Sequence, residues 1–354
     1  MKKGASVSWF SPVIMITGLV AGVLGALLVK WGNPANMGIC VACFVRDIAG
    51  GIGLHSAAVV QYIRPEIIGF VLGAFLSAGF TNEFKAQGGS SPVLRFLLGA
   101  LMMIGALMFL GCPLRMVLRL AGGDLNAVLG LAGFIAGIAI GVVFLKSGFV
   151  LSRAYPLARI NGWVMPLAMV GLLALVMVKP GFIFFSKQGP GSQHAALLVS
   201  LGVGLLVGVL AQRSRFCFAA GVRDKILLNN SHLLVGFVLV FIAALLANVA
   251  LKQFHLGFAN QPVAHTSHVW NFLGLLLVGL SAVLLGGCPL RQLILTGEGN
   301  TDSGITFLGM LAGAGFAHNF LLASSPKGPT LNGQIAVIAG IIFCLIIGYA
   351  NREE

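Results

Sequence analysis

The amino-acid sequence predicts an all-α, polytopic membrane protein that contains two inverted repeats of long transmembrane helices around short broken or re-entrant helices. Three observations predict this fold class: the composition, the lengths of the apolar segments and an internal duplication. Of the 354 residues, 58% are hydrophobic and 9% are charged, and the mean hydropathy is +0.99. A soluble domain carries about 25% charged residues, so the composition excludes that class.

The apolar segments fall into two length classes. A helix needs roughly 17–25 apolar residues to span a bilayer. Ten segments meet or approach this length and are predicted to span the membrane, at residues 12–30, 65–80, 92–111, 124–146, 163–179, 194–211, 231–251, 268–287, 302–322 and 331–350. Four others are interrupted or too short, at residues 39–58, 113–121, 216–228 and 289–296. We predict that these four are half-helices or re-entrant segments buried in protein.

The short segments are related in pairs. The motif G-C-P-L-R occurs at residues 111–115 and again at 287–291, and C-V-A-C-F-V-R-D at 40–47 aligns with C-F-A-A-G-V-R-D at 217–224. Two colinear matches at nearly one offset indicate an internal duplication. An odd number of spans separates the copies, which predicts inverted repeats, as in many secondary transporters. The expected division is a first repeat over 1–146, a linker with one extra span over 147–193, a second repeat over 194–322, and a final helix with a tail over 323–354.

The basic residues are distributed as single residues and pairs in loops. The formal net charge is +13, but no basic arm is present, so a nucleic-acid partner is not expected and the lipid bilayer is the expected surroundings. The bias of loop charges places both termini in the cytoplasm of a bacterial cell, with Lys2 and Lys3 contributing at the start. The first apolar segment is long enough to span, so we expect a retained helix in the inner (plasma) membrane and not a cleaved signal peptide.

The candidate functional residues are four cysteines that recur in both halves. Each begins a short segment, and in G-C-P-L-R the proline after the cysteine favours the first position of a helix, which puts the cysteine at the N-cap. The helix N-terminus would stabilise a thiolate or a nearby anion. These four residues are Cys40, Cys112, Cys217 and Cys288. Cys344 has no counterpart in the other half and is expected only to pack.

Arginines accompany these cysteines. Arg115 and Arg291 follow by three positions and have no acidic neighbour in the same turn, so we expect them to attract an anion. Arg46 and Arg223 follow by six and each precedes an aspartate, so a structural ion pair remains as plausible as a role in the pathway.

Thiols beside positive charge suit an anion that carries a polarisable sulfur or selenium atom. A thiol can donate a weak hydrogen bond to such an atom, or its thiolate can attack it. Cys40 and Cys43 also form a C-x-x-C, so a redox role is kept as an alternative. A zinc site is not expected because the second half contains no C-x-x-C. The sequence shows no cofactor motif and no motif of a hydrolase. We therefore expect that the protein holds no resident metal or cofactor and is not an enzyme.

These paired motifs resemble the YeeE/YedE family of sulfur-compound membrane transporters, and more closely its YedE-type branch associated with selenium metabolism. The resemblance implies an hourglass of long helices around short ones, with a narrow cysteine-lined path, and its best-understood members import thiosulfate. In this sequence the path residues would be Cys40, Cys112, Cys217 and Cys288.

The resulting hypothesis is an importer of a small selenium- or sulfur-containing anion. Two alternatives come from other classes: a membrane thiol oxidoreductase that uses Cys40 and Cys43, and a scaffold that docks a cytoplasmic sulfur- or selenium-carrier protein. The sequence shows no acidic residue deep within a predicted span, so facilitated uptake without a coupling ion is expected.

Overall fold

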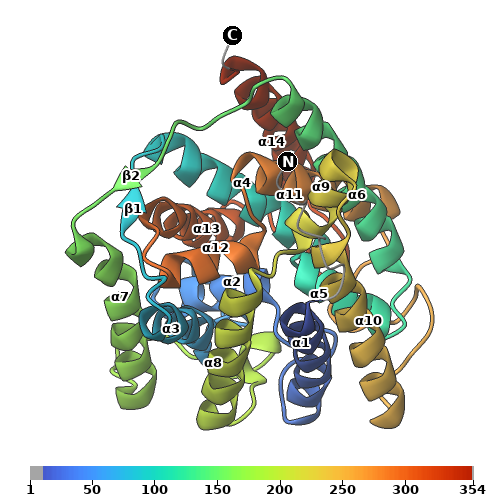
Figure 1. Cartoon of the computed structure of the whole chain (residues 1–354). Coiled ribbons are helices and arrows are strands. Elements are labelled where there is room, and N and C mark those ends of the chain that lie inside the picture. The colour runs from blue at the N-terminus through green and yellow to red at the C-terminus, as the bar shows by residue number, and fades with distance from the viewer. Residues whose placement is uncertain (1–10, 353–354) are drawn as a thin grey trace.

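The computed structural model describes residues 11–352, and their regular secondary structure is almost entirely helical (Figure 1). Residues 1–3, whose charges entered the orientation argument, lie outside the described part. The helices are α1 (Pro12–Lys30), α2 (Val41–Gly51), α3 (Pro65–Phe80), α4 (Pro92–Phe109), α5 (Pro113–Ala121), α6 (Asn126–Lys146), α7 (Arg159–Val178), α8 (Leu197–Ser214), α9 (Phe218–Leu228), α10 (His232–Ala250), α11 (His268–Leu284), α12 (Pro289–Gly297), α13 (Thr301–Asn319) and α14 (Leu331–Ala350). Two-residue strands β1 (Gln87–Gly88) and β2 (Tyr155–Pro156) pair antiparallel, and a single 3-10 turn, η1, covers Pro190–Ser192.

All fourteen predicted segments contain a helix. Within the described chain, eight helical stretches are long and apolar enough to cross a membrane, and three of these join a long helix to the short helix that follows it. The chain is thus an all-α polytopic membrane protein. The number is lower than the ten predicted spans, because α3 is a shorter apolar helix of 16 residues and α13 carries polar residues such as Asp302 and His318. The segment predicted over 39–58 is helical only in its first part, as α2.

The two halves correspond helix by helix. Helices α1 to α6 match α8 to α13 in order and in approximate length, while α7 lies between the halves and α14 follows them. The short helices match most closely: α2 and α9 each begin directly after a repeated cysteine, and α5 and α12 each begin at the proline of G-C-P-L-R. Even the turns that follow α5 and α12 agree, since Gly123 and Gly299 have φ angles of 94° and 95°.

The repeats are inverted relative to each other. Near the start of α1, the Thr17 hydroxyl lies 3.2 Å from the carbonyl oxygen of Leu210, which is near the end of α8. After the end of α1, the Asn33 side-chain oxygen accepts a hydrogen bond of 2.9 Å from the amide of Ala195, which precedes α8. The two equivalent helices therefore run antiparallel. The pairing pattern is symmetric as well, because α1 packs on α10 as α8 packs on α3, and α4 packs on α13 as α11 packs on α6.

Glycines allow these helices to approach closely. A Cβ atom on Gly204 of α8 would lie 2.6 Å from the Glu66 carbonyl oxygen of α3, and one on Gly137 of α6 would lie 2.0 Å from the Leu276 carbonyl oxygen of α11. Close backbone packing through small residues is how helices associate where lipid removes the hydrophobic driving force. The outer helices thus form a tight shell.

Three of the short helices, α2, α5 and α12, occupy the interior of this shell. The prediction of burial is wrong for the second half of α9, because only its residues up to Val222 are buried. In Figure 1, α2, α5 and α12 lie between the long helices. Every residue of α2 is buried, and eight of the nine residues of α5 are buried. Because α2 and α5 are buried, the cysteines at their N-termini also lie in the interior, and this places the candidate site there. The division of the chain at residues 146, 193 and 322 stays a prediction.

Candidate substrate pathway

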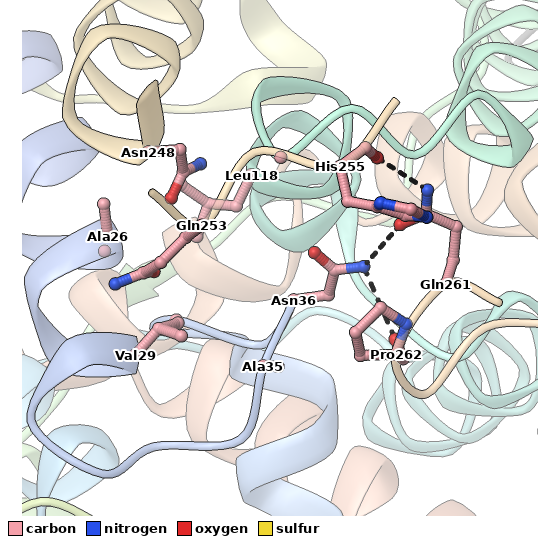
Figure 2. A pocket seen from close by; sticks show the side chains of 13 residues that line it. Ala26, Val29, Ala35, Asn36, Leu118, Asn248, Gln253, His255, Gln261 and Pro262 are labelled. Atoms are coloured by element: carbon pink, nitrogen blue, oxygen red, sulfur yellow. Dashed lines mark hydrogen bonds between the residues drawn. The ribbon is translucent and has the colours of Figure 1, made fainter. Parts of the chain in front are cut away.

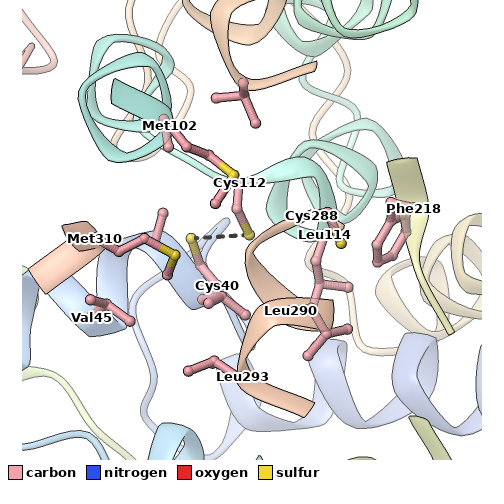
Figure 3. Packing of buried hydrophobic residues seen from close by; sticks show 14 of the residues in the cluster. Cys40, Val45, Met102, Cys112, Leu114, Phe218, Cys288, Leu290, Leu293 and Met310 are labelled. Carbon is pink, nitrogen blue, oxygen red and sulfur yellow. Dashed lines mark hydrogen bonds between the residues drawn. The ribbon is translucent and has the colours of Figure 1, made fainter. Parts of the chain in front are cut away.

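The four repeated cysteines form two thiol pairs, one within each repeat. The Sγ atoms of Cys40 and Cys112 are 3.9 Å apart, and those of Cys217 and Cys288 are 3.7 Å apart. All four residues are at most 2% exposed. Figure 3 shows Cys40 and Cys112 facing each other. The structure therefore brings together residues that lie about 70 positions apart in the sequence.

Each thiol pair lies where the N-termini of two short helices converge. Cys40 and Cys112 are the N-cap residues of α2 and α5, and Cys217 and Cys288 are those of α9 and α12. The Cys40 sulfur accepts the amide of Cys43 at 3.3 Å. The Cys217 sulfur accepts the amides of Ala220 at 3.4 Å and of Cys288 at 3.5 Å. Two sets of free N–H groups and two helix dipoles thus point at each pair, an environment that favours negative charge.

Cys43 adds a third thiol to the first repeat only, because its counterpart in the second repeat is Ala220. The Cys43 sulfur lies 3.8 Å from the Leu110 carbonyl oxygen and 3.2 Å from a terminal guanidinium nitrogen of Arg115. The first pair is therefore next to a cation, and the second pair lacks the third thiol.

Arg115 is held by backbone carbonyl groups. Its Nε donates to the Asn36 carbonyl oxygen at 2.8 Å, one terminal nitrogen donates to Val263 at 3.0 Å, and the other contacts the Leu110 carbonyl oxygen. The side chain is 0% exposed. Within residues 11–352 no carboxylate forms an ion pair with it. Arg115 is thus a buried cation without a counter-charge beside the first thiol pair.

Arg291, the equivalent residue in the second repeat, has a different partner. Its guanidinium pairs with the carboxylate of Glu298 at 2.9 Å, and a second contact measures 3.4 Å. Sequence reasoning examined only the same helical turn, whereas Glu298 lies seven positions further, past the end of α12. The charge near the second pair is therefore neutralised.

Arg46 and Arg223 both form the ion pairs considered from the sequence. Arg46 contacts Asp47 at 2.7 Å, and Arg223 contacts Asp224 at 2.8 Å. Asp47 is also bound by Arg64 at 2.7 Å, so a carboxylate with 0% exposure lies between two guanidinium groups. Arg46 and Asp47 belong to α2, whose N-cap is Cys40, and Arg64 is the N-cap of α3, so this network joins the two helices.

Arg119 and Glu66 are among the buried ionisable groups that the sequence reasoning missed. Arg119 on α5 pairs with Asp124 at 2.7 Å, donates to the Phe109 carbonyl oxygen at 2.8 Å and stacks over the Phe109 ring. Glu66, the second residue of α3, is 0% exposed. Its position at the very start of a predicted span gave no sign of burial in the sequence.

A pocket of about 180 Å³ adjoins the chain segment that leads to Cys40 (Figure 2). Its wall includes Gly38, two residues before Cys40, and Leu118 of α5. His255 and four amide side chains supply the polar lining; the amides are Asn36, Asn248, Gln253 and Gln261. The Asn36 carbonyl oxygen that binds Arg115 belongs to the same loop, so the pocket lies next to the residues that surround the first thiol pair.

All six cysteines are free, and Cys344 is buried in α14 away from the two pairs. Among residues 11–352 no group of three or more His, Cys, Asp or Glu side chains is arranged to hold a metal ion.

Inverted repeats with short helices at their centre are a common architecture among secondary transporters. Comparison with known proteins supports a particular family within this class. Residues 213–345 match the family model described as "Sulphur transport". The chain is also 32% identical over 101 residues to a protein named thiosulfate transporter TsuA from Spirochaeta thermophila, and 28% identical over 109 residues to one of the same name from Escherichia coli.

These matches cover part of each chain. They span 28% and 31% of this protein, and 30% of each relative. They support the sulfur-compound transporter family that the cysteine motifs indicated, while nothing in them distinguishes the selenium-associated branch.

Proposed function

We propose that this protein imports a small sulfur- or selenium-containing anion, such as thiosulfate or a selenium analogue, along a path that passes both thiol pairs. The matches to two proteins named thiosulfate transporter support transport of a sulfur anion. The assignment of Cys40, Cys112, Cys217 and Cys288 to the path rests on the geometry described above.

The observation that carries the proposal is the combination of Arg115 with the first thiol pair. A buried cation without a counter-charge costs several kcal/mol of desolvation. Backbone carbonyl groups compensate part of this cost, and a passing anion would supply the missing charge. Two converging helix N-termini add further positive potential. The first thiol pair is therefore a binding site that stabilises an anion after the anion has lost its hydration shell.

The thiols themselves select for a soft atom. Sulfur atoms 3.7–3.9 Å apart at each pair leave S–H groups that can donate to a terminal sulfur or selenium atom of the substrate. A hard oxyanion such as sulfate gains little from a thiol, because S–H is a weak donor. Specificity for thiosulfate-like anions follows from this difference.

The second thiol pair would hold the anion less tightly. Arg291 is neutralised by Glu298, so the net positive charge near Cys217 and Cys288 is smaller than near Cys40 and Cys112. In the expected orientation, with the N-terminus in the cytoplasm, α1 ends at the outer face and the first pair faces the outside. Capture would then occur at the outer pair and release at the inner one, where a cytoplasmic sulfur- or selenium-carrier protein could accept the anion.

The redox alternative has weaker structural support. The Cys40 thiol faces Cys112, and the Cys43 sulfur is directed at the Leu110 carbonyl oxygen and Arg115. A C-x-x-C dithiol that works as a redox centre also needs an exposed sulfur, whereas Cys40 and Cys43 are both 0% exposed.

The test is uptake of radiolabelled thiosulfate and selenite by cells that lack other importers. Cys112→Ala and Cys288→Ala should each abolish uptake while the protein remains in the membrane. Cys344→Ala is the matched control, since it removes an equally buried thiol that lies outside the two pairs. Normal uptake by the Cys112→Ala protein would refute the cysteine path. Uptake of only one of the two compounds would decide between sulfur and selenium.

A further inference from the structure

The pocket beside the segment that leads to Cys40 contains amide side chains without hydrogen-bond partners (Figure 2). The amide nitrogen and oxygen of Gln253 are both buried, and neither has a partner. Within residues 11–352, Gln253 is the one residue for which this is true of both amide atoms. Asn248, near the end of α10, is 7% exposed, and no group of the described chain forms a hydrogen bond with its side chain.

A buried amide elsewhere in this chain is fully engaged. Gln212 of α8 accepts a hydrogen bond from the Ser77 hydroxyl at 2.7 Å and donates one to the Glu83 carboxylate at 2.6 Å. Burial of a polar group without a partner is unfavourable, and native proteins largely avoid it. Two unpartnered amides that line one pocket therefore indicate that the pocket binds a polar ligand.

Asn36 offers a third donor to this pocket. Its Nδ2 atom lies 3.4 Å from Oε1 of Gln261 and 3.5 Å from the carbonyl oxygen of Pro262. Both distances exceed the usual range of roughly 2.7–3.2 Å, so these contacts are weak and the Asn36 amide can turn to a ligand. Gln261 is held more firmly, because its own amide donates to the carbonyl oxygens of His255 at 2.8 Å and Gly257 at 3.0 Å.

The electrostatic potential in the pocket favours an anion. None of the described residues that line it is acidic. Behind its wall lies the guanidinium of Arg115, which donates to the carbonyl oxygens of Asn36 at 2.8 Å and of Val263, the neighbour of Pro262, at 3.0 Å. Because this cation has no counter-charge, its field extends through the low-dielectric wall into the pocket.

The volume suits a small ion. Sites for drug-sized molecules have volumes of about 300–1,000 Å³, whereas this pocket has about 180 Å³. One water molecule takes about 30 Å³ in the liquid. The pocket therefore has room for one small oxyanion together with a few of its water molecules.

We propose that this pocket is an entry site that binds the oxygen atoms of a sulfur or selenium oxyanion before it reaches the first thiol pair, with Asn36, Asn248 and Gln253 as donors. The inference rests on the proposed transport function and adds a first recognition step to it. Amide groups carry no charge, so they hold an anion less tightly than the Arg115 guanidinium and let it pass on. The amide oxygens accept hydrogen bonds from the water that remains on the anion.

Two sites of different chemistry then divide the recognition of thiosulfate. The amides bind its three oxygen atoms, and the thiols bind its terminal sulfur, to which an S–H group can donate. Sulfate presents only oxygen atoms. It should therefore occupy the pocket and gain little from the thiols, which makes it a competitive inhibitor that is not transported.

The test uses the purified full-length protein in two assays. In liposomes, initial rates of radiolabelled thiosulfate uptake are measured over a range of concentrations, with and without unlabelled sulfate. Equilibrium dialysis with radiolabelled sulfate measures binding to the protein in detergent, where no transport is needed. For the wild type, we expect sulfate to bind and to raise the KM for thiosulfate without a change in the maximal rate.

The variants replace a donor by an acceptor of the same shape. Asn248→Asp and Gln253→Glu each introduce a carboxylate that repels the anion, so the KM for thiosulfate should rise about tenfold or more and sulfate binding should be lost. Asn248→Leu removes the donor without adding charge and should raise the KM about three- to tenfold, which keeps the test valid if a carboxylate variant does not fold.

Two controls accompany these variants. Asn319→Asp adds the same charge at the end of α13, where the Asn319 side chain donates to the Leu54 carbonyl oxygen outside the pocket, and it should keep wild-type values. Cys112→Ala should lose transport and still bind sulfate as the wild type does, because the pocket contains no thiol.

The outcomes separate the two proposals. Thiosulfate uptake by the wild type that sulfate does not inhibit, together with no sulfate binding, would refute the entry site and leave transport intact. An unchanged KM and unchanged sulfate binding in Asn248→Asp and Gln253→Glu would refute it as well. Phospholipid that copurifies with the wild type and is lost in Asn248→Leu, without sulfate binding, would assign the pocket to a lipid headgroup and refute the proposal. Absence of thiosulfate uptake by the wild type would overturn the proposed function, while sulfate binding that is lost in Gln253→Glu would still support an anion site in this pocket.

Discussion

Replacement of Arg119 by leucine tests whether the buried ion pair of α5 holds the first repeat together. The Arg119 and Asp124 side chains are 0% exposed, their charged atoms lie 2.7 Å apart, and Asp124 also accepts two hydrogen bonds from Asn126. Arg119→Leu leaves the Asp124 carboxylate buried without its cation. Removal of one partner from such a pair costs about 3–5 kcal/mol.

The second repeat shows how the same site is built without charge. The positions equivalent to Arg119 and Asp124 are Leu295 and Asn300, and the backbone hydrogen bond between each pair is identical at 3.0 Å. The double variant Arg119→Leu with Asp124→Asn therefore copies a solution that this chain already contains. We expect it to be within about 1–2 kcal/mol of wild type, because an apolar replacement of a buried pair is often neutral.

The assay is thermal unfolding in detergent, followed by intrinsic fluorescence. At about 2 °C per kcal/mol for a protein of this size, Arg119→Leu should lower the Tm by about 6–10 °C, and the double variant should recover most of that loss. Asp124→Asn alone should also lower the Tm, since it leaves Arg119 unpaired. Equal losses in the Arg119→Leu and double variants would show that the ion pair does not set stability, and would refute the equivalence of the two sites.

Two further predictions concern helix packing and the second thiol pair. Gly137→Leu should prevent correct folding of the helix bundle, because even a Cβ atom would lie 2.0 Å from the Leu276 carbonyl oxygen. The measurement is the yield of monodisperse purified protein. The control is Gly171→Leu, which has open space around it and should give a normal yield. Glu298→Gln should remove the ion pair of Arg291 and so tighten anion binding near the second thiol pair. We expect net uptake to slow and thiosulfate binding to the purified protein to increase. Unchanged binding would contradict the role given to this ion pair.

Local sequence signals predicted the fold to a large extent. The starts of α5 and α12 were predicted to the residue, because proline at the first helical position and a preceding N-cap are local effects. The longer spans were predicted within a few residues, since hydrophobic length is also a local property. The prediction over 39–58 was too long because an apolar composition continues into the loop after α2. There the backbone bonds to side chains in place of helical partners: the Ala57 amide donates to the His55 ring, and the His55 carbonyl oxygen accepts from the Gln61 side chain.

The sequence by itself determined the membrane class, the duplication and the identity of the four repeated cysteines, because each depends on composition or on residues close together in the chain. Only the tertiary structure decided how the thiols pair, which arginine lacks a counter-charge and which carboxyl group is buried alone. Cys40 contacts Cys112, Arg115 donates to the carbonyl oxygen of Val263, and Glu66 accepts from the hydroxyl of Ser200, a residue 134 positions away. Such contacts depend on how two inverted repeats pack, and no local pattern specifies them.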